Sequence, residues 1–321
     1  MTKGTFVVLL VFLLWKQIVG RSDAANLWEN FTVQFTIIQL PWIAGAILLM
    51  PLNWALETLK WRNLVLPFES ISFWRAYRAV LAGASLAIIS PQRVGDLGGR
   101  ILLVSPAHQS KAVMATLICN WAQLLVLIVM GIGGVLLIIP ILFDYRAELY
   151  WSTLLVGLLI IGALGSMIYW RSRVVKYLLA RSFFKKWPQL TQPLELLRDY
   201  NNRQIAQTVL WATMRYLTYS LQYYCLLQFF GIAPPIVAAF GSIATIFLVQ
   251  TSIPLPALIG VLARGEIAIL MWTQYGATAI EALSASYFLF IINLIVPSLM
   301  GMVIILKLNI LKSLGYEKKS H

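Results

Sequence analysis

Cysteine and histidine are scarce in this chain of 321 residues, which has two of each. Cys119 and Cys225 both lie within apolar stretches, so the sequence offers neither a disulfide framework nor a metal-binding spacing of cysteines. His108 and His321 have no cysteine or carboxylate at ligand spacing. We therefore expect no metal site and no cofactor.

Charge is also in short supply: 12% of the residues are charged, whereas 60% are hydrophobic and the mean hydropathy is +0.80. A soluble domain carries about 25% charged residues, so this composition predicts a chain whose solvent is the bilayer. The net charge of +13 does not indicate nucleic-acid binding, because the basic residues lie mostly between and beside apolar runs. Such an excess is typical of orientation signals and of attraction to anionic lipid head groups.

Several apolar runs are candidates for membrane spans, since a helix needs ~20 apolar residues to cross a ~30 Å hydrocarbon core. An eleven-residue apolar run at 5–15 could belong to a signal peptide, but Lys16 ends it and the chain leads directly into another span. We therefore expect a retained first helix and about six full transmembrane helices. The other five cover residues 33–53, 112–142, 150–170, 206–230 and 283–306.

Lysine and arginine in the short connections predict the orientation. Eight basic residues fall in the loop 171–203, and others, such as Lys60 and Arg62, follow the span 33–53 or lie in the C-terminal tail. These segments are expected on the cytoplasmic side. The prediction is a multi-pass protein of the inner (cytoplasmic) membrane with both termini cytoplasmic.

Two regions, 72–110 and 236–276, begin and end on the same side, and their second arms (97–107 and 265–275) are too short to cross. Proline and glycine break helices at their tips. We predict two re-entrant helical hairpins whose flanking spans run in opposite directions, which is the pattern of an inverted repeat. The predicted fold is thus an all-α polytopic membrane protein, one domain of residues 1–321, with half-repeats 33–142 and 206–306 joined by the span 150–170 and the loop 171–203.

Ionisable residues near the hairpin tips are the candidate site. An Arg or Asp at a helix centre costs at least ~2.5 kcal/mol on insertion scales, so its presence indicates a role. Arg93, Asp96 and Arg100 have helical spacing and would share a face. We predict that Arg93, Arg100 and Arg215 bind a lipid phosphate, for which the planar guanidinium is suited, and that Asp96 and Glu266 orient them. Either carboxylate is the expected partner of Arg215.

Simpler interpretations of these residues stay open. The first tip could reach water, where its charges would form a solvated ion pair. Arg264 and Glu266 could be a local pair that holds the second hairpin closed. Pro91, Gly95, Pro254, Pro256 and Gly260 are expected to shape the two tips.

Both tips resemble the transmembrane region of the lysylphosphatidylglycerol synthase family, whose members are flippase-like. The resemblance is carried by Pro91, Arg93, Gly95, Asp96 and Arg100, by Pro254, Pro256, Gly260, Val261 and Glu266, and by Leu59-Lys60-Trp61-Arg62. The sequence departs from the family pattern at Gln92, at Asp96 and at the inserted Ala263-Arg264-Gly265. Because no soluble domain follows the last span, the resemblance implies the lipid-translocating half without the aminoacyl-transferase half.

The leading hypothesis is a translocase, or a lipid-binding membrane protein, for an anionic phospholipid or a polyprenyl-phosphate lipid, and not an enzyme. One alternative is a membrane enzyme that transfers a group to or from a lipid-linked substrate, with Asp96 or Glu266 as base. Another is a non-catalytic subunit that presents lipid to a separately encoded synthase.

Overall fold

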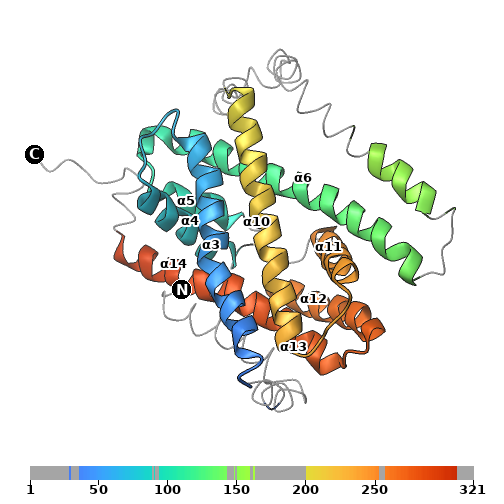
Figure 1. Ribbon diagram of the computed structural model, residues 1–321. Helices are drawn as coiled ribbons and strands as arrows, with labels where there is room; N and C mark the ends of the chain where they lie inside the picture. Colours follow the sequence, from blue (N-terminus) through green and yellow to red (C-terminus); the bar gives the residue numbers. More distant parts are fainter. Residues whose placement is uncertain are drawn as a thin grey trace, which may run out of the picture.

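The computed structural model describes residues Glu29, 36–88, Ser90, 94–142, Glu148, 150–159, Gly162, 200–252 and 257–308. The predictions for the first span, for most of the basic loop and for Pro91, Arg93, Pro254 and Pro256 fall outside these residues. Every regular element within them is helical, which confirms the all-α fold (Figure 1). The main helices are α3 (Leu40–Val65), α4 (Phe73–Ala87), α5 (Gly95–Ile101), α6 (Gln109–Leu142), α10 (Asn202–Phe229), α11 (Ile236–Ser252), α12 (Ala257–Trp272), α13 (Ala279–Phe290) and α14 (Val296–Lys307).

Three of the described helical segments are long and apolar enough to cross a membrane: Leu40–Val65, Pro106–Ile139 and Ala279–Lys307. The last of these joins α13 and α14 through a π-helical turn at Ile291–Ile295. A shorter apolar helix covers Tyr150–Leu159, within the predicted span 150–170. Together with the composition, these helices identify a multi-pass membrane protein, whereas the full number of spans and the side of each terminus remain predictions.

Helix α3 differs from its predicted bounds of 33–53, because it continues to Val65. Its 26 residues extend over about 39 Å at 1.5 Å per residue. The prediction that Lys60 belongs to a linker was therefore wrong: Lys60 lies inside α3 and is 1% exposed. A hydropathy count ends the span before Lys60 because the residue is charged. In the folded protein, side chains of neighbouring helices replace the water that would surround the ammonium group in a linker.

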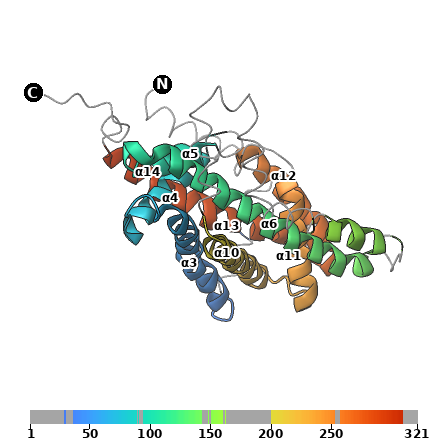
Figure 2. The same ribbon diagram turned by 90° about the horizontal axis from the view of Figure 1, so that it is seen from above.

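Helices α3 and α10 lie side by side and antiparallel at the centre of the molecule (Figure 1). Near one end of the pair, Asn63 Nδ2 donates to the carbonyl of Gln204 at 2.9 Å. Near the other end, Gln222 Nε2 donates to the carbonyl of Ala46 at 2.8 Å. Helix α6 crosses this pair and contacts both helices, as Figures 1 and 2 show. The three helices enclose the position where the candidate site lies.

Helices α4 and α5 form a tight antiparallel hairpin whose arms are too short to span a bilayer, since 15 and 7 residues give about 22 and 10 Å. Gly95 and Gly99 lie against the carbonyls of Leu86 and Ala82, so close that a Cβ at either position would collide with α4. The second arm covers Gly95–Ile101 rather than the predicted 97–107, and the re-entrant position of this hairpin in the membrane stays a prediction.

In the second hairpin region, α11 is followed by α12, which begins at Ala257 and ends at Trp272. Its second arm is thus a helix of 16 residues rather than the predicted short arm of 265–275. Gly260, Arg264 and Glu266 consequently lie within this helix and not at a broken tip. Residues 257–272 contain no proline that would interrupt a helix, so the arm can continue to Trp272.

The hairpins pack on each other's half of the chain. On the first, Ser298 Oγ of α14 donates to the carbonyl of Ala84 in α4 at 3.2 Å. On the second, Gly134 of α6 lies directly against Ala244 of α11. The first arm of each hairpin therefore contacts the last helix of the other half. The inverted repeat itself stays a prediction.

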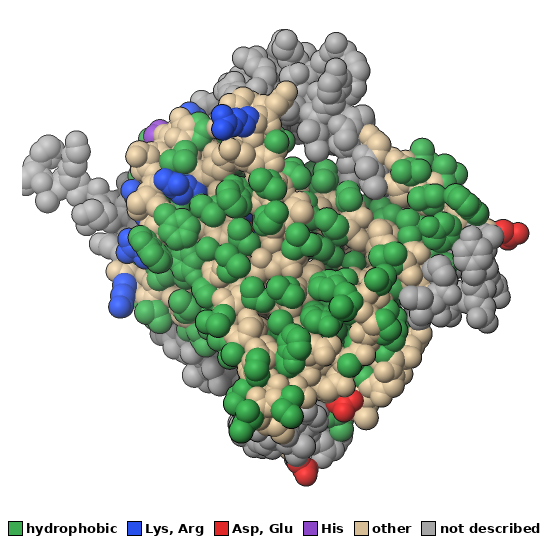
Figure 3. Space-filling model, viewed as in Figure 1, with side chains coloured by type: hydrophobic (Ala, Val, Ile, Leu, Met, Phe, Trp, Pro, Cys, Tyr) green, Lys and Arg blue, Asp and Glu red, His purple; other side chains and the backbone are tan. Residues whose placement is uncertain are grey.

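The surface is suited to lipid. On the face shown in Figure 3, hydrophobic side chains cover the middle of the molecule, Lys and Arg side chains gather at its upper left edge, and the visible carboxylates lie at the right and lower edges. Leu48 is 72% exposed and Leu270 68%, although both are aliphatic. A broad apolar belt between unlike charges is the surface expected of a protein that crosses a membrane.

Candidate functional site

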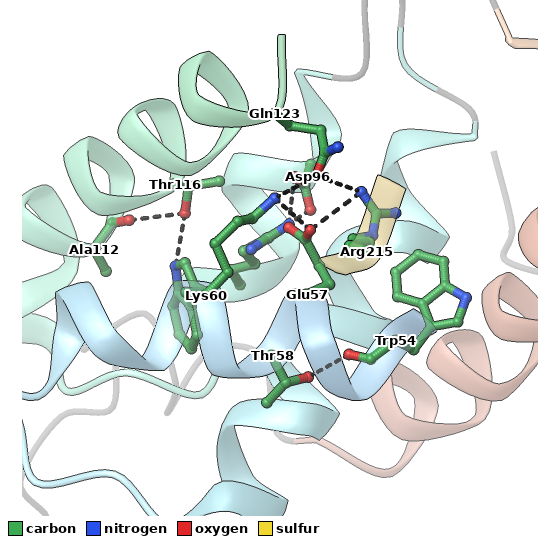
Figure 4. A network of polar contacts seen from close by, with 11 residues as sticks. Trp54, Glu57, Thr58, Lys60, Asp96, Ala112, Thr116, Gln123 and Arg215 are labelled. Carbon is green, nitrogen blue, oxygen red and sulfur yellow. Dashed lines mark hydrogen bonds and ion pairs between the residues drawn. The ribbon is translucent and has the colours of Figure 1, made fainter. Parts of the chain in front are cut away.

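A network of five charged side chains lies where α3, α5 and α10 meet α6 (Figure 4). Glu57, Lys60, Asp96 and Arg100 are each no more than 4% exposed, and the side chain of Arg215 is 19% exposed. Charges are rarely buried unless they are paired, because an ion loses its hydration in the interior. The contacts among these side chains supply that pairing.

Arg100 and Asp96 form a bidentate pair on α5. Arg100 Nε donates to Asp96 Oδ1 at 2.8 Å, and Nη2 donates to Asp96 Oδ2 at 2.9 Å. The two residues are four positions apart, which brings their side chains together on one face of a helix. Their predicted contact is confirmed, whereas Arg93 lies outside the described residues.

Glu57 of α3 connects three cations from three helices. Its Oε1 accepts from Arg100 Nη2 at 2.8 Å, while its Oε2 lies 2.6 Å from Lys60 Nζ and 3.2 Å from Arg215 Nη1. Lys60 belongs to α3 itself, Arg100 to the first hairpin, and Arg215 to the second half of the chain. One carboxylate therefore connects the two halves and the hairpin.

Helix α6 completes the network with neutral side chains. Gln123 Oε1 accepts from Lys60 Nζ at 3.2 Å and from Arg215 Nη1 at 3.4 Å. Two turns away, Thr116 Oγ1 accepts from Trp61 Nε1 at 2.9 Å. These contacts hold α6 against the charged face of α3.

Two tryptophans of α3 flank the guanidinium groups. The Cζ of Arg100 lies 5.9 Å from the ring centroid of Trp61, and that of Arg215 lies 5.7 Å from Trp54. Attraction of a cation to an indole face strengthens when water is excluded. The rings thus stabilise the two arginines and shield them from solvent.

The network lies deep in the helices. Arg215 is the fourteenth of the 28 residues of α10, so about 20 Å of helix lies on each side of it. Three cations and two carboxylates leave the cluster of five with a net charge of +1 (3 − 2). Within the described part of the chain, Arg100 Nη1 is buried and has no hydrogen-bond partner. The cluster of these five side chains therefore retains one positive charge and, at Arg100 Nη1, an unused donor of the kind that binds phosphate.

The sequence analysis did not nominate Glu57 as a site residue, and it predicted Glu266 or Asp96 as the partner of Arg215, whereas the observed partner is Glu57. A detectable signal was present. Asn53, Glu57 and Lys60 occur at helical spacing on an otherwise apolar stretch, which places them on one face. Such a polar stripe predicts a face directed into protein rather than lipid.

The second hairpin does not supply the network's charges. Arg264 Cζ lies 6.0 Å from the ring centroid of Phe290, while Gly265 packs closely against Tyr287. Glu266 is exposed on α12, unlike the buried carboxylates of Glu57 and Asp96. The role predicted for Glu266, to orient the phosphate-binding arginines, stays a prediction.

A family model described as the lysylphosphatidylglycerol synthase TM region matches residues 2–301. The resemblance inferred from the hairpin tips is thereby confirmed. No curated protein and no solved structure gave a significant match.

Proposed function

This chain belongs to the lysylphosphatidylglycerol synthase transmembrane-region family, and we propose that it moves a lipid with an anionic head group between the leaflets of the inner membrane. Family membership makes it a membrane protein concerned with lipid. The translocase activity, the phosphate contacts and the inner-membrane location are the proposal.

The buried ion network is the observation that carries this proposal. Transfer of an unpaired ion from water into hydrocarbon costs several kcal/mol or more of free energy, so a phosphate does not cross the membrane core unaided. The predicted span 206–230 would hold this cationic cluster, near the middle of α10, at the depth of the membrane where the barrier for a phosphate is highest. Arg100 and Arg215 have the planar donor groups that bind phosphate oxygens, and the two carboxylates hold them in place.

Group transfer fits the network less well. A general base must reach a proton on its substrate, and a free lone pair must face that proton. Asp96 accepts two hydrogen bonds from Arg100, and Glu57 is surrounded by three cations. Both carboxylates therefore stabilise cations and are poor bases. We propose transport in preference to catalysis.

Access to the network requires movement, since four of its five charged side chains are almost completely buried. Helices α3 and α10 belong to different halves and contribute Glu57 and Arg215. Rocking of one half against the other would open the cluster to one leaflet and then to the other, as in transporters built from inverted repeats. The burial of the network in this structure would correspond to the closed state of that movement.

The test is translocation of fluorescent phosphatidylglycerol and fluorescent polyprenyl phosphate in proteoliposomes. Wild type should move at least one of them, and Arg93→Ala, Arg100→Ala and Arg215→Ala should each reduce the rate about tenfold or more, the scale expected for losing one charged hydrogen bond. Arg203→Ala is the matched control, because Arg203 is an exposed arginine on α10. No movement of either lipid by wild type would overturn the proposal in favour of a lipid-presenting subunit or an enzyme.

A further inference from the structure

The contact between α3 and the π-helical turn contains a buried oxygen atom without a partner. Asn53 of α3 is 1% exposed, and its Nδ2 donates to Asn293 Oδ1 at 2.8 Å. Within the part of the chain that the structure describes, Asn53 Oδ1 accepts no hydrogen bond. Asn293 is 6% exposed, and its Oδ1 keeps a second lone pair after accepting from Asn53. Two amide oxygens therefore meet in the interior with capacity to bind a further group.

A backbone carbonyl of the same turn also loses its helical donors. The N–H of Val296 donates to the carbonyl of Ile291, five residues back, and so bypasses Ile292. The next residue is Pro297, which has no N–H to offer the carbonyl of Ile292 in the same register. Pro297 is four residues after Asn293, so this break in the hydrogen bonding lies on the face of the helix that meets α3.

We infer that this turn binds an alkali cation, Na⁺ or K⁺, through Asn53 Oδ1, Asn293 Oδ1 and the carbonyl of Ile292. Backbone carbonyls exposed where a transmembrane helix is interrupted coordinate Na⁺ in transporters built from inverted repeats. Calcium and magnesium ions use carboxylate ligands, whereas all three oxygens here are neutral. Glu57, one turn further along α3, is already bound by three cations. The expected absence of a metal site was based on cysteine and histidine, neither of which contributes here.

The position of the site provides coupling to lipid, a step that rests on the proposed function. Asn53 is four residues before Glu57, so about 6 Å of helix separates the turn from the ion network. A phosphate bound by Arg100 would attract a cation at this distance, and by linkage the cation would tighten phosphate binding by the same factor. The turn also contacts the hairpin that carries Arg100, since Ser298 Oγ donates to the carbonyl of Ala84 at 3.2 Å. Lipid and cation would thus move together.

Binding is tested without lipid transport, by thermal unfolding of the full chain in detergent with NaCl, KCl or choline chloride at constant ionic strength. Wild type should be stabilised saturably by at least one alkali ion and not by choline, because a ligand of the folded state stabilises it by mass action. Asn53→Ala should raise the half-saturating concentration of that ion about tenfold or more, the scale of one lost contact to a charged group. Pro297→Ala supplies the missing N–H and should weaken binding in the same direction, which keeps the test decisive if Asn53→Ala does not fold.

Asn63→Ala is the matched control, because Asn63 is also an amide of α3 but bonds to α10 away from the turn. This variant should unfold at a lower temperature and keep the wild-type response to the ion. Equal stabilisation by all three salts, or an unchanged half-saturating concentration in both Asn53→Ala and Pro297→Ala, would overturn the inference and leave the proposed function intact.

The coupling step is measured in proteoliposomes, where the ion that binds should accelerate movement of anionic lipid several-fold relative to choline. Equal rates with the ion and with choline would overturn the coupling. Ion-specific stabilisation of a wild-type protein that moves no lipid would support the cation site and overturn the proposed function.

Discussion

Glu57 Oε2 lies 3.2 Å from Arg215 Nη1, and this ion pair joins the two halves of the molecule. Each residue is on the central helix of its half, and those helices are antiparallel. The proposed rocking of the halves would therefore change the surroundings of the same carboxylate that holds Arg100 and Lys60. Glu57 thus belongs both to the candidate site and to the contact that the proposed rocking would change.

Removing the two partners of this pair should have unequal effects on stability. Glu57→Gln leaves three cations with one carboxylate and should cost about 3–5 kcal/mol, the range for breaking a buried ion pair. Arg215→Met leaves two cations and two carboxylates, all paired, and should cost clearly less. Thermal unfolding in detergent, followed by circular dichroism, measures both.

The double variant Glu57→Gln with Arg215→Met should be more stable than Glu57→Gln alone, since it removes one of the uncompensated cations. Equal losses for the two single variants, with simple addition in the double, would show that the three cations around Glu57 do not act as one network.

Gly83 of α4 lies directly against the Asp96–Arg100 pair. A Cβ at this position would meet a carboxylate oxygen of Asp96 and lie 2.9 Å from Arg100 Cγ. Gly83→Ala should therefore displace the pair and reduce lipid translocation about tenfold or more, the scale of one lost charged hydrogen bond. The measurement is translocation in proteoliposomes at equal amounts of reconstituted protein.

Gly133→Ala in α6 is the matched control for that change, because a Cβ added at Gly133 would have nothing within 4 Å of it. This variant should leave translocation unaffected and raise stability slightly through the higher helix propensity of alanine. If Gly83→Ala transported lipid as fast as Gly133→Ala, the position of the Asp96–Arg100 pair would not limit the activity.

The part of this site that sequence analysis predicted is local, whereas the contacts that it missed include one local pair, Glu57 with Lys60, and several between distant positions. The Asp96–Arg100 contact follows from a spacing of four residues within one helix. Glu57 is paired with Arg100, 43 positions along the chain, and Lys60 meets Gln123, 63 positions away. A hydropathy window has the length of one span, about 20 residues, and does not include partners so far along the chain. Lys60 is therefore predicted in a linker. The same reasoning explains why α3 was predicted to end too early.

The buried amides of Asn53 and Asn293 should contribute measurably to the contact between α3 and the π-helical turn. Asn53 Nδ2 donates to Asn293 Oδ1 at 2.8 Å, and both residues are no more than 6% exposed. Hydrogen bonds between transmembrane helices average ~0.6 kcal/mol and reach ~1.7 kcal/mol. A double-mutant cycle with Asn53→Ala and Asn293→Ala should give a coupling free energy within that range. A coupling indistinguishable from zero would show that the two amides find equivalent partners elsewhere.

Cys119 provides a native probe for opening of the network. It is completely buried on α6, three residues after Thr116 and four before Gln123, so all three share the face that meets Trp61 and Lys60. The only other cysteine of the chain is Cys225, and a Cys225→Ser variant leaves Cys119 as its single thiol. In the closed conformation, this variant should react slowly with a water-soluble maleimide.

Short-chain phosphatidylglycerol should accelerate that reaction several-fold, because lipid entry must separate α6 from α3 and admit water to the thiol. The rate is measured by mass spectrometry of the intact protein after timed quenching. The converse variant, Cys119→Ser, retains Cys225 and should show no such acceleration, since Cys225 lies near Gly45 at the far end of the α3–α10 pair. A Cys119 rate that the lipid leaves unchanged, in protein that still translocates it, would place the lipid path outside the network and remove the support for phosphate binding at Arg100 and Arg215.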